Sequence, residues 1–382
     1  MVIMVNFSLS NNQKNMIRDI RLLAPQLEKQ ALEIDSRHSA AFDYSLVTEL
    51  AKYNLLNPLV PPEYGGRGFD YFTNALLMEE IGAICPGLAT VMVFNCHFTS
   101  ILDMVGTPEQ KAQYLPLFTH KQPKLAAVAL SEKAAGSDVG NMDTQALLQD
   151  DCYTINGQKE YVVSGAIAEV MICFATLDPI RGRSKMLALI VPGDAKGLKA
   201  GQLRKSMGIR YAHTSELLFD NVTIPVANRI GAEGDGYMIV TQAIDRDKVL
   251  TGAIGVGLAR AAFAKALAFA KERKQFGRSI YDNQAIAFEF SKMAAQIESA
   301  RLVVWKASWL IDNNEDFTVA ASIAKIAGSA VAQEVVGKAV DIVGGRAYLE
   351  GNPLEKLYRD AKIFSTLEGT NHIQNAIIAS LL

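Results

Sequence analysis

Apolar residues recur at helical spacing in the first and last thirds of the chain. From Ile17 to Ile34 they follow one another at steps of three and four, and the same spacing runs from Ile286 to Ala307. This spacing places apolar side chains on one face of a helix, so it predicts long helices in both regions. Pro25 interrupts the first run and should kink or restart that helix, because proline lacks a backbone N–H donor.

The middle third has a different pattern, in which Gly, Asp and Thr separate short runs of residues that favour strands. Asn156-Gly157 stands between two such runs, 153–155 and 161–163, and this dipeptide is typical of a tight hairpin turn. Several strands in such a short region predict a small β-sandwich or β-barrel. Further strands are expected at Met186–Val191 and Leu217–Ile224.

The order of these patterns predicts the domain organisation. A chain of 382 residues is too long for one hydrophobic core, so several domains are expected. Helical, then β, then helical patterns predict an α+β fold. Its parts are an N-terminal all-helical domain (1–124), a central β domain (125–236) and a C-terminal four-helix-bundle domain (237–382).

Charge and cysteine content argue against several classes of function. The 38 basic and 40 acidic residues give a net charge of −2, which predicts neither nucleic-acid binding nor attraction to a membrane surface. The four cysteines and five histidines lack the spacings typical of metal sites, so no metal is expected. The N-terminus lacks the basic region of a signal peptide, and we expect no uninterrupted apolar stretch long enough to cross a bilayer. We therefore expect a cytoplasmic protein without membrane insertion.

Three short segments differ from ordinary packing sequence, although each also has a structural explanation. Residues 130–140, LSEKAAGSDVG, either offer hydroxyl groups and close backbone approach to a ligand or form a polar loop. Residues 272–280, ERKQFGRSI, either bind a phosphate beside an aromatic ring or complement a helix end. In residues 366–375, TLEGTNHIQN, Glu368 is either a first-turn residue of the last helix or a shielded general base with a raised pKa.

At these three segments together the sequence resembles the acyl-CoA dehydrogenase family of flavoproteins. The resemblance covers nearly the whole chain and keeps the order of the family's motifs. It is carried by PPEYGGRG, ALSEKAAGSD, INGQKEYVVSG, MGIRYAHTSELLFDNVTIP, GAEGDGY, ERKQFGRSI, IVGGRAY, EKLYRDAKI and LEGTNHIQ.

The resemblance implies FAD as the cofactor, held between the β domain and the C-terminal bundle across a subunit interface. It also implies α,β-dehydrogenation of an acyl thioester, in which Glu368 removes the α-proton and flavin N5 takes the β-hydride. The backbone N–H of Glu368 and a ribityl hydroxyl would stabilise the developing enolate. Electrons would pass to an electron-transfer flavoprotein, and the protein would form a homotetramer, a dimer of dimers.

The other site residues of the family carry over by position. Arg273 and Phe276 stand where the family reaches the FAD of a neighbouring subunit, and Ser137 where it contacts the pantetheine arm. The resemblance thus assigns cofactor binding to Val128, Leu130, Ser131, Tyr161, Val163, Arg273, Phe276, Asp341, Gly345, Thr370 and His372, and substrate binding to Ser137, Asp245, Lys248 and Gly369.

Several of these positions depart from the family pattern. Tyr161 and Val163 replace Trp and Thr, and a valine cannot donate a side-chain hydrogen bond to the flavin. Asp341 replaces a Gln near the expected pyrophosphate, which an aspartate would repel unless a cation or water intervened. His372 and Asn375 replace a Glu or Gln and an Arg.

The sequence leaves open the base, the acyl group and the acyl carrier. Asp247 occupies the position from which some family members draw their base, so it is an alternative to Glu368. His97 and Thr99 either lie near the acyl pocket, which would suit a short or polar acyl group, or form an ordinary buried helix face. The carrier is coenzyme A or a carrier protein, and the reaction is that of a dehydrogenase or an oxidase. A non-catalytic member that binds nucleic acid or a partner protein is a third hypothesis, which the lack of a basic C-terminal region disfavours.

Overall fold

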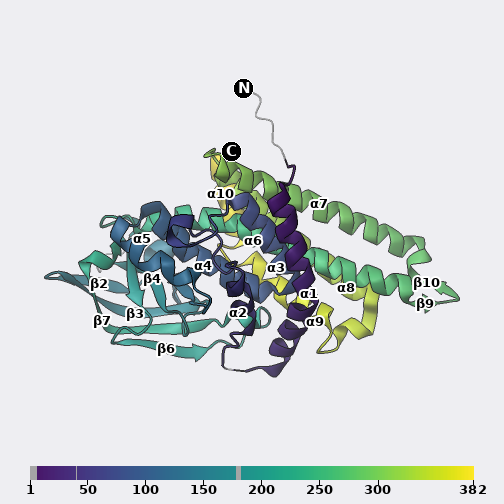
Figure 1. The fold of residues 1–382 in the computed structure, drawn as a ribbon, viewed down its shortest axis with the longest axis horizontal. Coiled ribbons are helices and arrows are strands. Elements are labelled where there is room, and N and C mark those ends of the chain that lie inside the picture. The colour runs from purple at the N-terminus through teal and green to yellow at the C-terminus, as the bar shows by residue number, and fades with distance from the viewer. Residues whose placement is uncertain (1–6, 40, 178–181) are drawn as a thin grey trace.

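The computed structural model describes residues 7–39, 41–177 and 182–382. Helices form the N-terminal part, a β-sheet forms the middle, and long helices form the C-terminal part (Figure 1). This is the order that the apolar patterns predicted. The sheet lies at one end of the molecule, and the long helices extend away from it toward the opposite end (Figure 1).

The N-terminal part begins with a well-capped helix, α1. Its N-cap, Ser10, accepts a hydrogen bond from the backbone of Gln13, whose side chain accepts one from the Ser10 N–H in return. The helix continues through Pro25, so a restart there is wrong; apolar residues on both sides of the proline are buried, and their packing holds the helix together. The helices of this part are α1 (Asn11–Arg37), α2 (Ser45–Lys52), α3 (Tyr71–Ile84), α4 (Pro86–Val105) and α5 (Pro108–Tyr114).

The middle part is one sheet in the order β6-β7-β3-β2-β4-β5-β8, with β1 paired in parallel to β4. Both faces of β4 are buried, because alternate residues of this strand join different clusters. Ile172 packs with residues of α4 and α6, whereas Cys173 packs with residues of other strands. The strands are β1 (Ala126–Ala129), β2 (Gln145–Gln149), β3 (Cys152–Val162), β4 (Val170–Thr176), β5 (Met186–Pro192), β6 (Leu198–Leu203), β7 (Ser215–Pro225) and β8 (Arg229–Ile230).

The hairpin turn predicted at Asn156-Gly157 is wrong. Both residues lie inside β3, which pairs with β2 on one side and β7 on the other. Gly157 lies at a shift in the β3–β7 register, and a Cβ there would come within 2.4 Å of Thr144 Oγ1. The glycine therefore allows a close approach within the sheet. The tight turn lies instead between β2 and β3, where Asp150 has φ 50°.

The C-terminal part holds the long helices that the periodicity predicted, and α6 packs against α8, α7 and α3. The face predicted for α7 is buried from Phe290 to Ala307. A small hairpin, β9–β10, lies at the end of the bundle far from the sheet (Figure 1). The elements are α6 (Gly236–Glu272), β9 (Lys274–Gln275), β10 (Arg278–Ser279), α7 (Gln284–Asp312), α8 (Thr318–Val343), α9 (Pro353–Ala361) and α10 (Asn371–Leu381).

Among the residues that the structure describes, three helices are long and apolar enough to cross a membrane, which corrects the expectation that no apolar stretch would be long enough. They are α4, α6 and the segment Thr318–Tyr348. The share of each apolar window that is buried inside the fold is 78% for α4 and 56% for each of the others. A helix that contacts neighbours on several sides becomes apolar nearly all round, and such a helix resembles a membrane span in composition.

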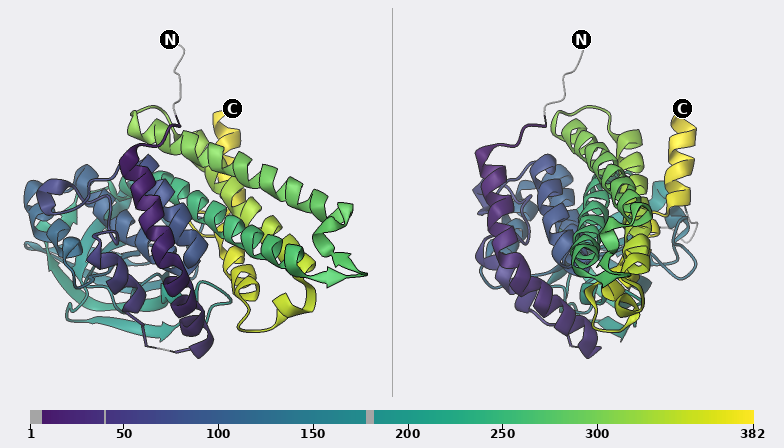
Figure 2. Two further views of the ribbon diagram at one scale, coloured as in Figure 1. Left: turned by 45° about the vertical axis from the view of Figure 1, so that its right-hand side comes forward. Right: turned by 90° about the vertical axis from the view of Figure 1, so that its right-hand side faces the viewer.

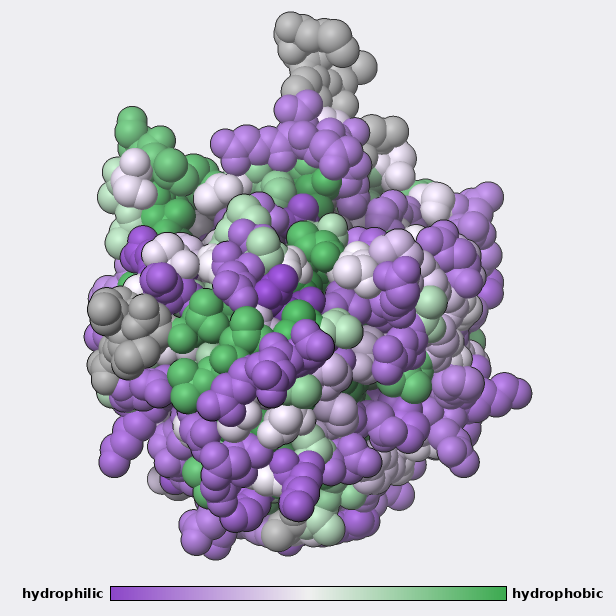
Figure 3. Space-filling view, turned by 90° about the vertical axis from the view of Figure 1, so that its left-hand side faces the viewer, coloured by the Kyte–Doolittle hydropathy of each residue, from purple (hydrophilic) through white to green (hydrophobic). Residues whose placement is uncertain are grey.

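The chain ends in α10, which stands beside the bundle and projects from it (Figure 2). Its last residues, Leu381 and Leu382, are exposed. Figure 3 shows a largely polar face of the molecule on which apolar residues gather in patches, one of them at this projecting end.

Candidate active site

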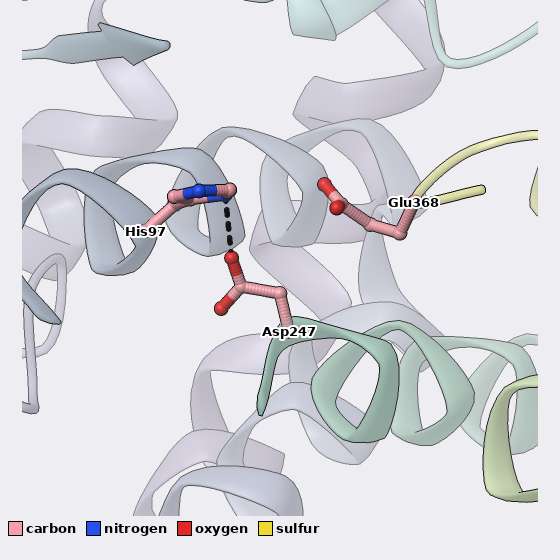
Figure 4. Close-up of side chains that lie close together, drawn as sticks. All are labelled: His97, Asp247 and Glu368. Carbon is pink, nitrogen blue, oxygen red and sulfur yellow. Dashed lines mark ion pairs between the residues drawn. The ribbon is translucent and has the colours of Figure 1, made fainter. Parts of the chain in front are cut away.

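Three buried titratable side chains point toward one another in the interior (Figure 4). His97 comes from α4, Asp247 from α6, and Glu368 from the turn before α10. Their exposed fractions are 2%, 0% and 9%. The fold thus brings together the predicted base, the alternative base and one residue expected near the acyl pocket.

Glu368 lies on a left-handed turn rather than in the first turn of the last helix. Its φ is 54° and that of Gly369 is 79°, and helix α10 starts only after its N-cap, Thr370. The buried side-chain amide of Gln374 donates to the backbone carbonyls of Glu368 and Gly369, each at 3.2 Å. Because a non-glycine residue in this region is strained, the hydrogen bonds from Gln374 are needed to hold the turn.

Burial raises the pKa of Glu368 to about 7. The charge of Asp247 also raises the pKa of Glu368. The positive charges of His97, Lys325 and Lys248 lower it. A carboxyl group with a pKa near neutrality suits a general base, because it is ionised at working pH and still binds a proton well.

His97 and Asp247 form a buried ion pair behind Glu368. Nδ1 of His97 lies 2.7 Å from Oδ2 of Asp247. Burial lowers the pKa of His97, but the charges of Asp247 and Glu368 outweigh that effect, so the pKa of His97 ends above its ordinary value. Burial raises the pKa of Asp247, and His97 opposes that rise.

The three ligating atoms lie within 4.8 Å of one another, a spacing that a metal ion could use. However, the 2.7 Å between His97 and Asp247 is shorter than the roughly 3.3 Å that separates two donors on one tetrahedral zinc ion with bonds of about 2.0 Å. The arrangement present is an ion pair. The absence of a metal therefore stays a prediction.

Two buried lysines lie near this group, and the sequence analysis missed one of them. Lys248, an expected substrate-binding residue, donates to Asp245 Oδ1 at 2.5 Å. Lys325 on α8 was not predicted; it donates to Asn371 Oδ1 at 2.8 Å, and burial lowers its pKa to about 8 despite the charge of Glu368. A lone lysine within the apolar run of a helix was the signal that could have identified it.

The expected flavin-binding segment is held to the sheet by a second buried charge pair. Lys159, which is fully buried, donates to Leu130 O at 2.9 Å and to Glu132 Oε1 at 2.8 Å. The backbone N–H of Glu160 donates to Ser131 O at 2.8 Å. The sequence analysis named Leu130 and Ser131 but missed the lysine that fixes their loop.

Apart from His372, which is exposed in the first turn of α10, the remaining predicted site residues fall into two groups. Close to the β domain, Val128 and Val163 are buried, Tyr161 is 62% exposed and Ser137 is exposed. The second group lies around the far end of the bundle, since the ring of Phe269 at the end of α6 packs on Arg346 just after α8. Its members Arg273, Phe276, Asp341 and Gly345 are all exposed and come from elements that meet far from the sheet (Figure 1).

Comparisons with known proteins agree along the whole chain. Residues 11–122 match the family model described as acyl-CoA dehydrogenase, N-terminal domain, residues 127–222 match the middle domain, and residues 234–382 match the C-terminal domain. The chain is 35% identical to the short-chain specific acyl-CoA dehydrogenase of Clostridium acetobutylicum, over 98% of this chain and 99% of that protein.

Two further relatives are also similar to this chain over nearly its whole length. The chain is 33% identical to the caffeyl-CoA reductase-Etf complex subunit CarC of Acetobacterium woodii, over 97% of this chain and 98% of that protein. The structure of butyryl-CoA dehydrogenase from Megasphaera elsdenii superposes with a TM-score of 0.93 at 32% identity, covering 99% of each chain.

Proposed function

The chain belongs to the acyl-CoA dehydrogenase family of FAD-dependent oxidoreductases, and we propose that Glu368 is the base of its α,β-dehydrogenation reaction. One observation carries this assignment. Glu368 is buried on a strained turn that Gln374 holds, and burial raises its pKa to about 7. Asp247, the alternative base, is fully buried behind it and paired with His97.

Two sets of residues in this chain have the chemistry to bind FAD. The loop at Leu130 and Ser131 is fixed by Lys159, while the fully exposed ring of Phe276 and the exposed Arg273 are free to cover a cofactor outside their own fold. An aromatic face stacks on a flavin ring and a guanidinium binds a phosphate. When bound, FAD takes up the hydride that leaves the β-carbon of the acyl group.

The protein's own part is to position the thioester and to hold the α-proton. The backbone N–H of Glu368 donates no hydrogen bond within the described residues, so it can donate to the thioester carbonyl oxygen. Such a bond stabilises the enolate that forms as the α C–H bond breaks and the proton passes to the carboxylate of Glu368. Burial excludes the water that would otherwise protonate that enolate.

The partners follow from the same proposal. We assign electron-transfer flavoprotein as the acceptor of the electrons, because the Acetobacterium woodii relative is a subunit of a caffeyl-CoA reductase-Etf complex. We also propose a homo-oligomer, a dimer of dimers, because Arg273 and Phe276 lie beside and on the β9–β10 hairpin, which is at the end of the bundle far from the sheet (Figure 1). Location in the cytoplasm is proposed as well, in keeping with four cysteines that are all free.

Anaerobic flavin reduction by a panel of acyl-CoA esters tests the assignment, monitored by the loss of absorbance at about 450 nm. Glu368→Gln should lower the reduction rate by about 10²–10⁴-fold while FAD stays bound, because the proton has lost its acceptor. Asp247→Asn is the matched control, since it removes the other candidate carboxylate. If Asp247→Asn abolishes reduction and Glu368→Gln does not, the base has been assigned to the wrong residue.

A further inference from the structure

The His97–Asp247 pair has hydrogen-bonding capacity that the protein does not use. Within the part of the chain that the structure describes, Nδ1 of His97 lies 2.7 Å from Oδ2 of Asp247, whereas Nε2 of His97 and Oδ1 of Asp247 have no hydrogen-bond partner. Buried polar atoms are nearly always satisfied, so atoms left without partners beside a candidate base point to a missing ligand.

The pair lies deeper than Glu368, where the far end of an acyl group would be. Glu368 is the least buried of the three residues, and all three ligating atoms lie within 4.8 Å of one another. An acyl group whose α-carbon contacts Glu368 therefore meets His97 and Asp247 only a few atoms further on. The ring of Phe94 stacks on that of His97 with centroids 6.3 Å apart and fixes its orientation.

The neighbouring charged groups are already engaged. Lys248 donates to Asp245, Lys325 donates to Asn371, and Arg246 donates to Gln242 O. None of these cations donates to Asp247, whose Oδ1 has no hydrogen-bond partner among the described residues. What remains free is one ring nitrogen of His97, which carries a proton when the pair is ionised, and one oxygen of Asp247. The pair thus presents a donor and an acceptor side by side, with little net charge.

We infer that this site selects a short acyl thioester whose distal end carries a neutral group able to donate and accept hydrogen bonds, such as a hydroxyl, and that His97 and Asp247 bind that group. This inference rests on the proposed function, because it places the acyl group at Glu368. A plain alkyl chain of equal length leaves the polar atoms of the pair unsatisfied and is selected against. A carboxylate or an ammonium group adds a buried charge that the ionised pair does not neutralise.

Binding to the FAD-loaded Glu368→Gln variant, which cannot turn over, measures this selection by calorimetry. The probes are 4-hydroxybutyryl-CoA and pentanoyl-CoA, which differ only in a terminal hydroxyl or methyl group. The hydroxyl ester should bind at least about tenfold more tightly. Equal or tighter binding of pentanoyl-CoA overturns the inference. If glutaryl-CoA or 4-aminobutyryl-CoA binds more tightly than the hydroxyl ester, the distal group of the substrate is charged, and the inference of a neutral group is overturned.

Protein variants, each combined with Glu368→Gln, assign the effect to the pair. His97→Leu should reduce the preference for the hydroxyl ester to about onefold or reverse it, and Asp247→Asn should weaken it. His120→Leu, the same change at an exposed position, should leave the preference unchanged. A preference that survives His97→Leu overturns the assignment, and the comparison of the two esters decides the substrate class even where a variant does not fold.

The two proposals fail in different ways. If no acyl-CoA ester reduces the flavin of the wild-type protein, the proposed reaction is wrong, but the ratio of binding constants still decides the selectivity. If pentanoyl-CoA and butyryl-CoA reduce the flavin as fast as the hydroxyl ester, the reaction stands and the inference about the pair is wrong.

Discussion

The carboxylate of Glu368 is attached to a backbone at φ 54°, a conformation that costs a residue with a Cβ about 1–2 kcal/mol. Gln374, which is fully buried, offsets that cost with hydrogen bonds to two carbonyls of the turn. The same turn directs the carboxylate of Glu368 into the interior, beside His97 and Asp247. Strain in the backbone and a raised pKa therefore arise from the same local arrangement.

The rate of flavin reduction should follow the ionisation of Glu368. Only the carboxylate accepts a proton, and its pKa is raised to about 7 by burial, with His97, Asp247, Lys325 and Lys248 as the other charged groups that face it. The rate should therefore rise about tenfold per pH unit below this pKa and level off above it. Stopped-flow reduction across the pH range measures the profile. A rate that is already constant from about pH 5 upward would show that burial does not raise the pKa of the base.

At the scale of the elements, the packing of α6 on α8 positions three of the groups around the site. Asp247 and Lys248 come from α6, and Lys325 comes from α8. The two helices approach closely because glycines face one another: a Cβ on Gly255 would lie 2.3 Å from Gly328 O. The helices can lie this close only because Gly255 and Gly328 have no side chains, and the spacing of the buried charges depends on that distance.

A methyl group at this crossing should be poorly tolerated. Gly255→Ala forces the helices apart and should destabilise the protein by about 1–3 kcal/mol, measured as the free energy of unfolding in denaturant. Gly337→Ala on α8 is the matched control, since a Cβ there meets nothing within 4 Å. That change should be neutral or stabilising by up to about 1 kcal/mol, because alanine favours a helix. Equal effects of the two substitutions would contradict a close helix crossing.

At the scale of the whole molecule, the two ends of the chain's long bundle carry different parts of the expected cofactor site. Leu130 and Ser131 directly follow β1 of the sheet, while Arg273 and Phe276 lie on and beside the β9–β10 hairpin at the opposite end (Figure 1). The ring of Phe276 on this protruding hairpin is fully exposed. The proposed site shared between neighbouring subunits would bring the two parts together.

Mixing two inactive variants should test the shared site. In Arg273→Ala the chain lacks its contribution to the neighbour's FAD, and in Glu368→Gln it lacks the base. If each site takes Arg273 from one chain and Glu368 from another, refolding the two variants together should restore up to about a quarter of the wild-type sites. Lys274→Ala on the same hairpin should behave as wild type. No recovery in a mixture that has formed hetero-oligomers would contradict the shared site.

The sequence by itself determined the order of helical and β regions, the buried face of α7 and the importance of Glu368. These features depend on local periodicity and on a contiguous motif, which the chain displays directly. The sequence analysis misplaced the turn at Asn156-Gly157, because pairing of β3 with two other strands overrides a local turn preference. It also expected no apolar stretch long enough to cross a bilayer, whereas α4, α6 and the segment Thr318–Tyr348 are long and apolar enough, because burial inside the fold favours an apolar composition.

Only the tertiary structure decided which groups surround Glu368. His97, Asp247 and Lys325 come from helices far apart in the sequence, and no local pattern places their side chains within reach of one another. The ion pair of Lys159 with Glu132 and the close packing of α6 on α8 also join segments that are apart in the sequence. A pKa depends on burial and on nearby charge, both of which arise from long-range packing. For this reason the sequence could single out Glu368 as a candidate base, but only the fold could show which charged groups surround it.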